Sequence, residues 1–187
     1  MAKRIWKTSP DSGTYRSLDN PAVHPRDDLA MLELFRGGMP VGDRWDPREY
    51  GLFEDPGDSL KPTGDFLGFG GAPFLVVNSR ALALLHPTVK DDLVEVLPLR
   101  STLGELAVLN IGLVDCLDHS SSKLSYFSSG GIVSIDVYSF IDKRIQRKHI
   151  FRLPEEPMSG IFVDDAFKTI VEENRLEGLI FRGLSQV

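Results

Sequence analysis

The sequence predicts an α+β fold, in which a mixed, largely antiparallel sheet carries a few short helices packed on it. Three observations predict this class. From Phe74 onward, short apolar runs alternate with turn residues, which is typical of compact domains built from strands and helices. Residues 131–138 alternate between apolar and polar side chains, as a strand with one solvated face does. The last third of the chain follows the order strand, helix, strand.

The first strand and helix of this region are predicted from a short stretch of sequence. Phe74–Val77 is continuously apolar and predicts a buried strand. Asn78 or Ser79 can accept a backbone N–H and so begin a helix. Pro87 predicts the end of that helix, because a proline disfavours helical geometry in the residue before it, His86. We therefore expect a short, buried helix after the strand.

Three further segments predict strands. Leu93–Leu99 and Glu105–Ile111 are apolar on nearly both faces, so they predict neighbouring central strands. In Gly131–Tyr138, the apolar residues at 133, 135 and 137 face one way and the polar residues at 134 and 136 face the other. One face of this last strand is therefore expected to meet water.

Residues 149–153 predict another strand, which Pro154 ends because proline lacks a backbone donor. His149 shares its face with two large apolar residues, while Ile150 and Arg152 lie on the opposite face. A lone histidine on an apolar face is most often a hydrogen-bonded core residue. We expect that role for His149.

The chain ends on a helix and a strand. Phe162–Val163 leads to Asp164, whose carboxylate suits the positive end of a helix. The helix has an apolar stripe at Phe167, Ile170 and Val171. Residues 174–178 close it, and residues 179–181 predict the final strand.

The N-terminal third is expected to form a loop-rich segment, residues 1–73, that packs on an α+β domain of residues 74–187. Residues 37–71 hold nine of the 17 glycines and four prolines, which is too dense for regular elements to persist. Large apolar side chains interrupt the charged stretch of this segment, whereas a flexible tether contains few such side chains. The segment is therefore expected to pack on the body or on another molecule.

Composition narrows the function. The 187 residues suit one domain, and 21 Lys and Arg against 27 Asp and Glu give a net charge of −6, which argues against a nucleic-acid ligand. A single cysteine, Cys116, excludes an intramolecular disulfide and a cysteine-based zinc cluster. The longest apolar run, Ala81–Leu85, is far too short to span a membrane, and no secretory signal is recognisable. We expect a cytoplasmic protein without a cofactor; the pattern leaves open whether it forms a homo-oligomer.

The enzymatic motifs are incomplete. Gly57–Leu60 spells the nucleophile block of an esterase family around Ser59, but no strand precedes it and no histidine lies three residues after an aspartate. Ser120–Lys123 matches Ser-x-x-Lys without its companion motifs and is expected to form a polar turn. A turn explains both stretches better than a catalytic role does.

Asp115, Asp118 and His119 are the best candidate metal ligands, because two carboxylates and an imidazole occur within five residues. No second cluster supplies the remaining ligands, so a capped turn is the favoured interpretation. A small hydrolase that uses Ser59 or this metal site is the alternative to a non-catalytic binding protein.

Several blocks resemble polymorphic-toxin immunity protein family 11, which is typified by a myxobacterial protein. The resemblance covers roughly residues 74–184, and its most specific part is the spacing between the histidine-containing strand, the following helix and the last strand. It implies a non-catalytic protein that binds a cognate secreted toxin, in some cases a nuclease, and protects bacteria during competition. The matched residues are mainly fold determinants. The blocks are Phe74–Ser79, Leu93–Leu99, Leu109–Asn110, Val114–Asp115, His149–Pro154, Ile161–Phe167 and Gly178–Phe181.

An acidic segment, residues 43–58, is the candidate toxin-binding surface. A nuclease is basic where it holds phosphate, so carboxylates can occupy that surface, and large aromatic residues can anchor the interface. The alternative is that the aromatics cover the core while the acids form a solvated face. The candidate toxin-binding residues are Asp43, Trp45, Asp46, Glu49, Tyr50, Phe53, Glu54, Asp55 and Asp58.

Overall fold

The structure is a computed structural model that describes residues 3–19, 33, 35–45, 49–52, 61–69 and 72–185. Its named elements, in chain order, are β1 (Ile5–Pro10), β2 (Ser17–Asp19), the 3-10 helix η1 (Gly42–Arg44), β3 (Glu49–Leu52), β4 (Phe66–Phe69), β5 (Ala72–Asn78), α2 (Ser79–Val89), β6 (Val94–Ser101), β7 (Leu106–Ile111), β8 (Lys123–Tyr126), β9 (Ile132–Val137), α3 (Asp142–Ile145), β10 (Ile150–Phe151), β11 (Ile161–Asp164), α4 (Asp165–Glu173) and β12 (Leu179–Gly183).

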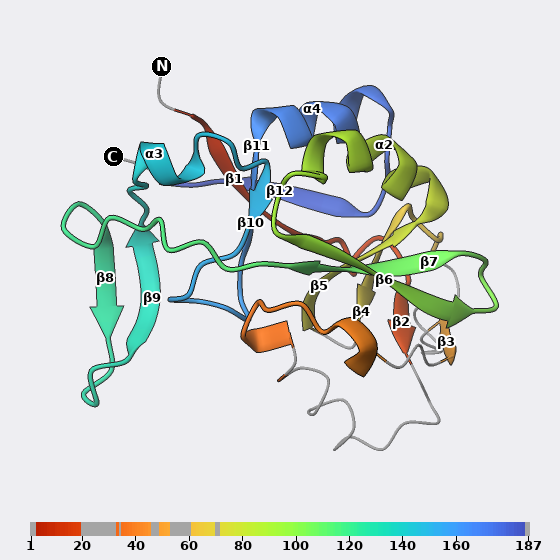
Figure 1. Ribbon diagram of the computed structural model, residues 1–187, viewed down its shortest axis with the longest axis horizontal. Coiled ribbons are helices and arrows are strands. Elements are labelled where there is room, and N and C mark those ends of the chain that lie inside the picture. The colour runs from red at the N-terminus through yellow and green to blue at the C-terminus, as the bar shows by residue number, and fades with distance from the viewer. Residues whose placement is uncertain are drawn as a thin grey trace.

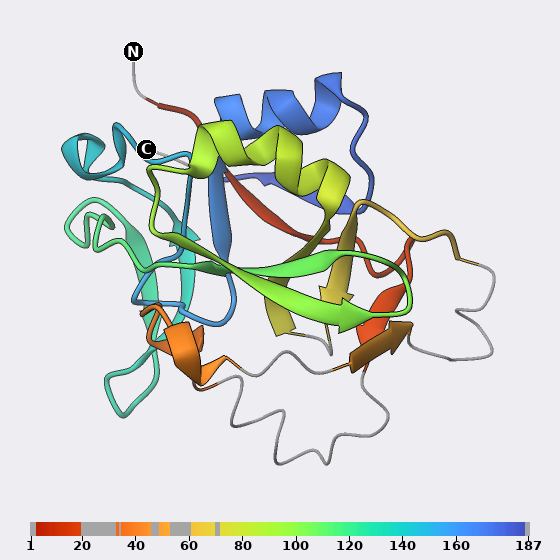
Figure 2. The same cartoon turned by 45° about the vertical axis from the view of Figure 1, so that its right-hand side comes forward.

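These elements form an α+β fold, as the sequence predicts, with the strands divided among three sheets. Six strands close a barrel in the order β2-β3-β6-β7-β5-β4, in which β2–β4 and β3–β6 are parallel pairs and the other pairs are antiparallel. Four strands form an antiparallel sheet in the order β10-β11-β1-β12. The β8–β9 hairpin stands to one side, and α2 and α4 lie together on the face away from η1 (Figures 1 and 2).

Three clusters of buried apolar side chains hold the fold together. Alternate residues of the barrel strands enter two of them: Leu75 packs with α2 and α4, whereas Phe74 faces a second cluster inside the barrel, where Phe35 also lies. The third cluster contains Cys116 and lies between the four-stranded sheet and the β8–β9 hairpin. Each fully buried large apolar side chain contributes about 1.5–3 kcal/mol relative to an exposed one, so these clusters dominate the stability.

The N-terminal third pairs with later strands in both larger sheets. β1 lies between β11 and β12, where Thr8 pairs with Ile161 on one side and with Phe181 on the other. β2, β3 and β4 complete the barrel. The sequence did not predict β1, because neither face of this strand is continuously apolar: Ile5 shares its face with Lys7, and Trp6 shares its face with Thr8.

The first helix is capped as predicted but ends later. Asn78 Oδ1 accepts the amide N–H of Ala81 at 2.8 Å, so Asn78 is the N-cap. The prediction that Pro87 ends the helix is wrong, because α2 continues to Val89. The final turn keeps the hydrogen bond from Lys90 N–H to the carbonyl of His86, and Val89 is buried in the core. Packing here outweighs the local preference of the residue before proline.

The C-terminal helix and strand agree with their predictions. Asp164 Oδ1 accepts the N–H of Phe167 at 3.0 Å and caps α4. Oδ2 of Asp164 lies 2.8 Å from Nδ1 of His149 and 2.9 Å from the Lys3 ammonium. His149 is therefore hydrogen-bonded, as expected, but the prediction that it is a core residue is wrong, because 35% of its side chain is exposed. The segment that begins at His149 differs from expectation in one respect. Ile150 and Arg152, on the face opposite His149, are also buried, so both faces of the segment are covered.

Candidate functional site

Several exposed apolar side chains lie along β6 or beside it. We define the β6 surface as Met39, Trp45, Leu93, Glu95, Val96 and Pro98. The exposed fraction is 67% for Met39, 59% for Leu93 and 39% for Val96. Clustered exposed apolar side chains beside hollows are typical of binding surfaces, whereas scattered ones are not. Two hollows flank β6, one on each side.

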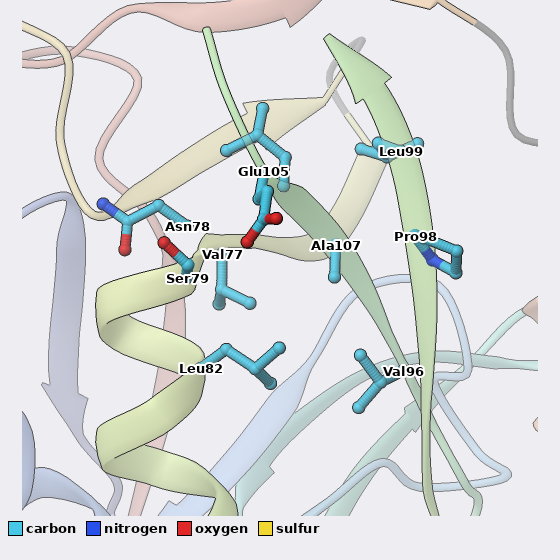
Figure 3. Close-up of a pocket in the computed structure, with 10 residues that line it drawn as sticks. Val77, Asn78, Ser79, Leu82, Val96, Pro98, Leu99, Glu105 and Ala107 are labelled. Atoms are coloured by element: carbon cyan, nitrogen blue, oxygen red, sulfur yellow. The ribbon is translucent and has the colours of Figure 1, made fainter.

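The first hollow, which we call the α2 groove, lies between α2 and the β6–β7 hairpin and has a volume of about 300 Å³. Figure 3 shows Leu82 of α2 and Val96 and Ala107 of the hairpin pointing toward the same space, with Ser79 and Glu105 at its edge. The groove is thus mainly apolar and has polar groups only along one side. It suits an apolar side chain of a partner.

The second hollow, which we call the Asp92 pocket, has a volume of about 460 Å³. Segment 37–40 forms one wall, and the start of β6 with the end of β7 forms the other. Two carboxylates and a buried amide contribute polar atoms to an otherwise apolar lining. Its lining residues are Gly37, Gly38, Met39, Pro40, Asp92, Leu93, Val94, Glu95, Asn110 and Leu113.

Glu95 fixes one wall of this pocket to the other. Its carboxylate accepts the amide N–H groups of Val41 and Gly42, each at 2.8 Å, and the side-chain amide of Asn110 at 3.0 Å. Desolvation by burial opposes ionisation, but these three hydrogen bonds and the Arg44 charge outweigh it and lower the pKa of Glu95. Glu95 is therefore an ionised clamp between β6, β7 and the start of η1.

Asp92 is buried beside the same pocket. Its Oδ2 accepts the amide N–H groups of His149 at 2.9 Å and Ile150 at 3.1 Å, which ties β10 to the start of β6. Desolvation raises the pKa of Asp92 despite these bonds and the nearby Lys148. Its second oxygen, Oδ1, is buried and accepts no hydrogen bond from any residue that the structure describes; the Lys148 ammonium lies 3.7 Å away.

A buried arginine, Arg152, holds segment 35–38 in place. Arg152 donates to the carbonyl oxygens of Phe35 and Ile111, each at 2.6 Å, and of Pro157 at 2.9 Å. Desolvation lowers its pKa to about 10, so the guanidinium stays protonated at neutral pH. Gly38 has a φ of +61°, and a Cβ there would lie 2.6 Å from the Leu113 side chain. Glycine is thus required where this segment approaches Leu113, just after β7.

The described part of the acidic segment runs along β6. Asp43 is exposed on η1. Trp45 is partly buried against the barrel cluster, and its indole N–H donates to the carbonyl of Pro98 at 2.8 Å. Glu49 and Tyr50 belong to β3, whose backbone pairs with the end of β6. The other candidates, Asp46, Phe53, Glu54, Asp55 and Asp58, lie outside the described residues.

The residues of the hydrolase alternative do not form one site in the part of the chain that the structure describes. Ser59 lies outside the described residues. Asp115 pairs with Arg144, His119 pairs with Glu155, and Asp118 accepts hydrogen bonds from the serines that follow it. Those hydrogen bonds lower the pKa of Asp118, as in a capped polar turn. Within the described ranges, no three His, Cys, Asp or Glu side chains gather closely enough to hold a metal ion.

Sequence reasoning missed Asp92, Glu95 and Asn110. Each is polar and buried or half-buried, and Glu95 and Asn110 interrupt otherwise apolar strands. Buried polar groups need partners, so a polar residue in a central strand was a usable signal. Glu95 and Asn110 also face each other in the β6–β7 register, which the sequence alone does not reveal.

None of the helices in the described ranges is both long and apolar enough to cross a membrane.

In the comparison with known proteins, the part of the chain that matches a family begins after β6. No curated protein matches the chain. The family match covers residues 109–186, from the end of β7 through β12, so the resemblance noted for residues 74–108 lies outside it. Residues 109–186 match the immunity protein family (Imm11), the family that the sequence resembles, and this match supports an immunity function.

Proposed function

We propose that this chain neutralises a cognate toxin domain by binding it in a stoichiometric complex, without turning over a substrate. The observation that carries the proposal is the match of residues 109–186 to the immunity protein family (Imm11). An inhibitor of this kind needs a surface that is complementary to the toxin, and it needs no reacting groups. A stable complex is expected to bury a standard interface of about 1,600 Å² in total.

We place the toxin contact on the β6 surface and the adjoining acidic segment. Exposed apolar residues and two hollows on β6 support this placement, since interfaces combine apolar anchors with a polar rim. Asp43, exposed on η1, adds negative charge beside this surface, which suits a basic toxin surface such as that of a nuclease. Its proposed contact residues are Asp43, Trp45, Asp46, Glu49, Tyr50, Phe53, Glu54, Asp55 and Asp58.

The direct test is co-expression with the toxin domain encoded beside the gene. We expect growth to be rescued and a complex of defined stoichiometry to purify. Rescue without a complex would indicate enzymatic detoxification and would contradict the proposal. Failure of rescue with the adjacent toxin would contradict it as well.

A charge reversal tests the placement of the contact. Asp43 is exposed on η1, so Asp43→Lys should leave the fold intact and weaken toxin binding by about tenfold, with the larger effect at low salt. Glu173→Lys is the matched control, because Glu173 is exposed in the last turn of α4, where a cation is favourable. Equal affinity of both variants for the toxin would show that the toxin contact lies outside the acidic segment.

Asp43 is a better probe than Trp45. The Trp45 ring packs edge-on against Phe35 with centroids 6.0 Å apart, and its N–H is bonded to Pro98. Trp45→Ala would therefore disturb the barrel cluster together with any interface. A loss of binding in that variant is interpretable only if the stability and the β6 amide signals stay unchanged.

A further inference from the structure

Two residues that line the Asp92 pocket each have a buried oxygen without a hydrogen bond from the described part of the chain. Oδ1 of Asp92 and Oδ1 of Asn110 receive no hydrogen bond from any described residue, and both residues line the pocket. The Asn110 amide is held in this orientation, because its Nδ2 donates to Glu95 and to the carbonyl of Met39 at 3.1 Å. A buried polar atom without a partner destabilises the fold, because it has lost its hydrogen bonds to water. Both oxygens therefore retain the capacity to accept a hydrogen bond.

The charges around the pocket favour a cation. Asp92 and Glu95 are the ionisable groups of the described lining, and the lining contains no lysine or arginine. Three cations that the structure describes lie outside the lining: Lys148 is 3.7 Å from Asp92, Arg44 acts on Glu95 from η1, and the buried Arg152 lies behind Gly38. The described lining is therefore acidic on balance, although neighbouring cations partly screen it.

The mouth of the pocket is apolar. Met39 and Leu93 are the two most exposed apolar side chains of the β6 surface, and Leu113 lies deeper in the lining. An acidic interior behind an apolar mouth matches a side chain with an aliphatic stem and a charged tip. Lysine and arginine have this form, since they bury their methylene groups while the head group makes polar contacts.

We propose that the Asp92 pocket receives a lysine or arginine side chain of the toxin domain. The head group donates to Oδ1 of Asp92 and Oδ1 of Asn110, and the stem packs between Met39 and Leu93. This inference rests on the proposed function, and it adds the chemistry of one contact to it. A basic toxin surface would supply the cation, and the pocket would fix its position.

The first arm of the test uses a small probe, n-butylammonium chloride, with the neutral n-butanol as its matched control. Titration into the ¹⁵N-labelled chain should give saturable shifts at the amides of Asp92, Glu95 and Asn110, with millimolar affinity for the ammonium and none for the alcohol. Asp92→Asn retains an acceptor for His149 and Ile150 but removes the charge, so it should weaken binding at least tenfold. Absence of these shifts, or equal shifts with butanol, would overturn the proposal.

The second arm uses the purified toxin complex. Leu93→Lys places an ammonium at the mouth, on an exposed position, and should weaken toxin binding at least tenfold. Leu103→Lys is the matched control, because Leu103 is exposed in the β6–β7 turn and does not line the pocket; its affinity should stay within twofold of the wild type. Equal affinities of the two variants would overturn the proposed contact while leaving the immunity function intact. A wild-type chain that forms no complex would refute the function itself.

Discussion

Replacing Glu95 by alanine should release segment 39–42 from the barrel while the rest of the fold remains. The carboxylate of Glu95 holds three donors: the N–H groups of Val41 and Gly42 and the amide of Asn110. Hydrogen bonds to a charged group are worth about 1.5–3 kcal/mol each. Gly42 is exposed, so water compensates part of the loss, and we expect a net local cost of about 2–4 kcal/mol.

Hydrogen exchange followed by NMR measures this cost where it arises. Since every 1.4 kcal/mol is a factor of ten, a loss near 3 kcal/mol should lower the protection of the Val41 and Gly42 amides by about a hundredfold. The amide of Leu109, in the buried strand β7, should keep its protection. Glu95→Gln keeps one oxygen acceptor and should lose less. Unchanged protection of Val41 and Gly42 in Glu95→Ala would refute the clamp.

The same bonds predict an effect of acid. The pKa of Glu95 is lowered in the folded chain, so its contribution is present above the unfolded pKa of about 4.3 and is lost as the pH falls through the lower folded value. Protection of the Val41 and Gly42 amides, corrected for intrinsic exchange, should therefore fall in that acid range in the wild type. In Glu95→Gln it should stay flat over the same range.

Three further outcomes test other parts of the structure. Gly178→Ala should destabilise the fold by several times the roughly 1 kcal/mol expected for Gly104→Ala in urea denaturation, because both glycines have φ near +100° but only a Cβ at 178 would lie 2.2 Å from the Phe66 carbonyl oxygen. Burial raises the pKa of the Cys116 thiol to about 12, so a thiol reagent at pH 8 should label it only at the rate of unfolding; rapid labelling would contradict its burial. Asp164→Ala should lower the free energy of unfolding by about 2–4 kcal/mol, and Asp164→Asn should lower it less, since asparagine keeps an oxygen that can cap the helix. Equal melting temperatures of the two variants would show that the cap contributes nothing.

Local chemistry explains why some elements could be predicted. Asn78 and Asp164 cap helices by accepting an N–H three residues ahead, so both caps lie within a few residues of sequence. Glu105–Ile111 is apolar on nearly both faces and predicts a central strand, and all six residues of β7 are buried. Pro87 shows the limit of this reasoning, because the packing of Val89 decides where α2 ends.

The candidate site depends on contacts between remote parts of the chain. Glu95 binds the amide of Val41 across 54 residues, and Arg152 binds the carbonyl of Phe35 across 117 residues. No spacing rule connects such pairs, because the sheet order and the strand register determine which side chains meet. The acidic segment was visible in the sequence, whereas the hollows beside β6 were not.

The sequence by itself determined the α+β class, the Asp164 cap, the two candidates for the other cap and the likeness to an immunity family, since each depends on neighbouring residues or on their spacing. Only the tertiary structure decided that β1 lies between β11 and β12, that six strands close a barrel, and that Asp92, Glu95 and Asn110 meet beside segment 37–40. The physical reason is that burial and hydrogen bonding between distant segments are collective. A polar residue within an apolar strand shows that a partner is needed, and the fold alone determines which one.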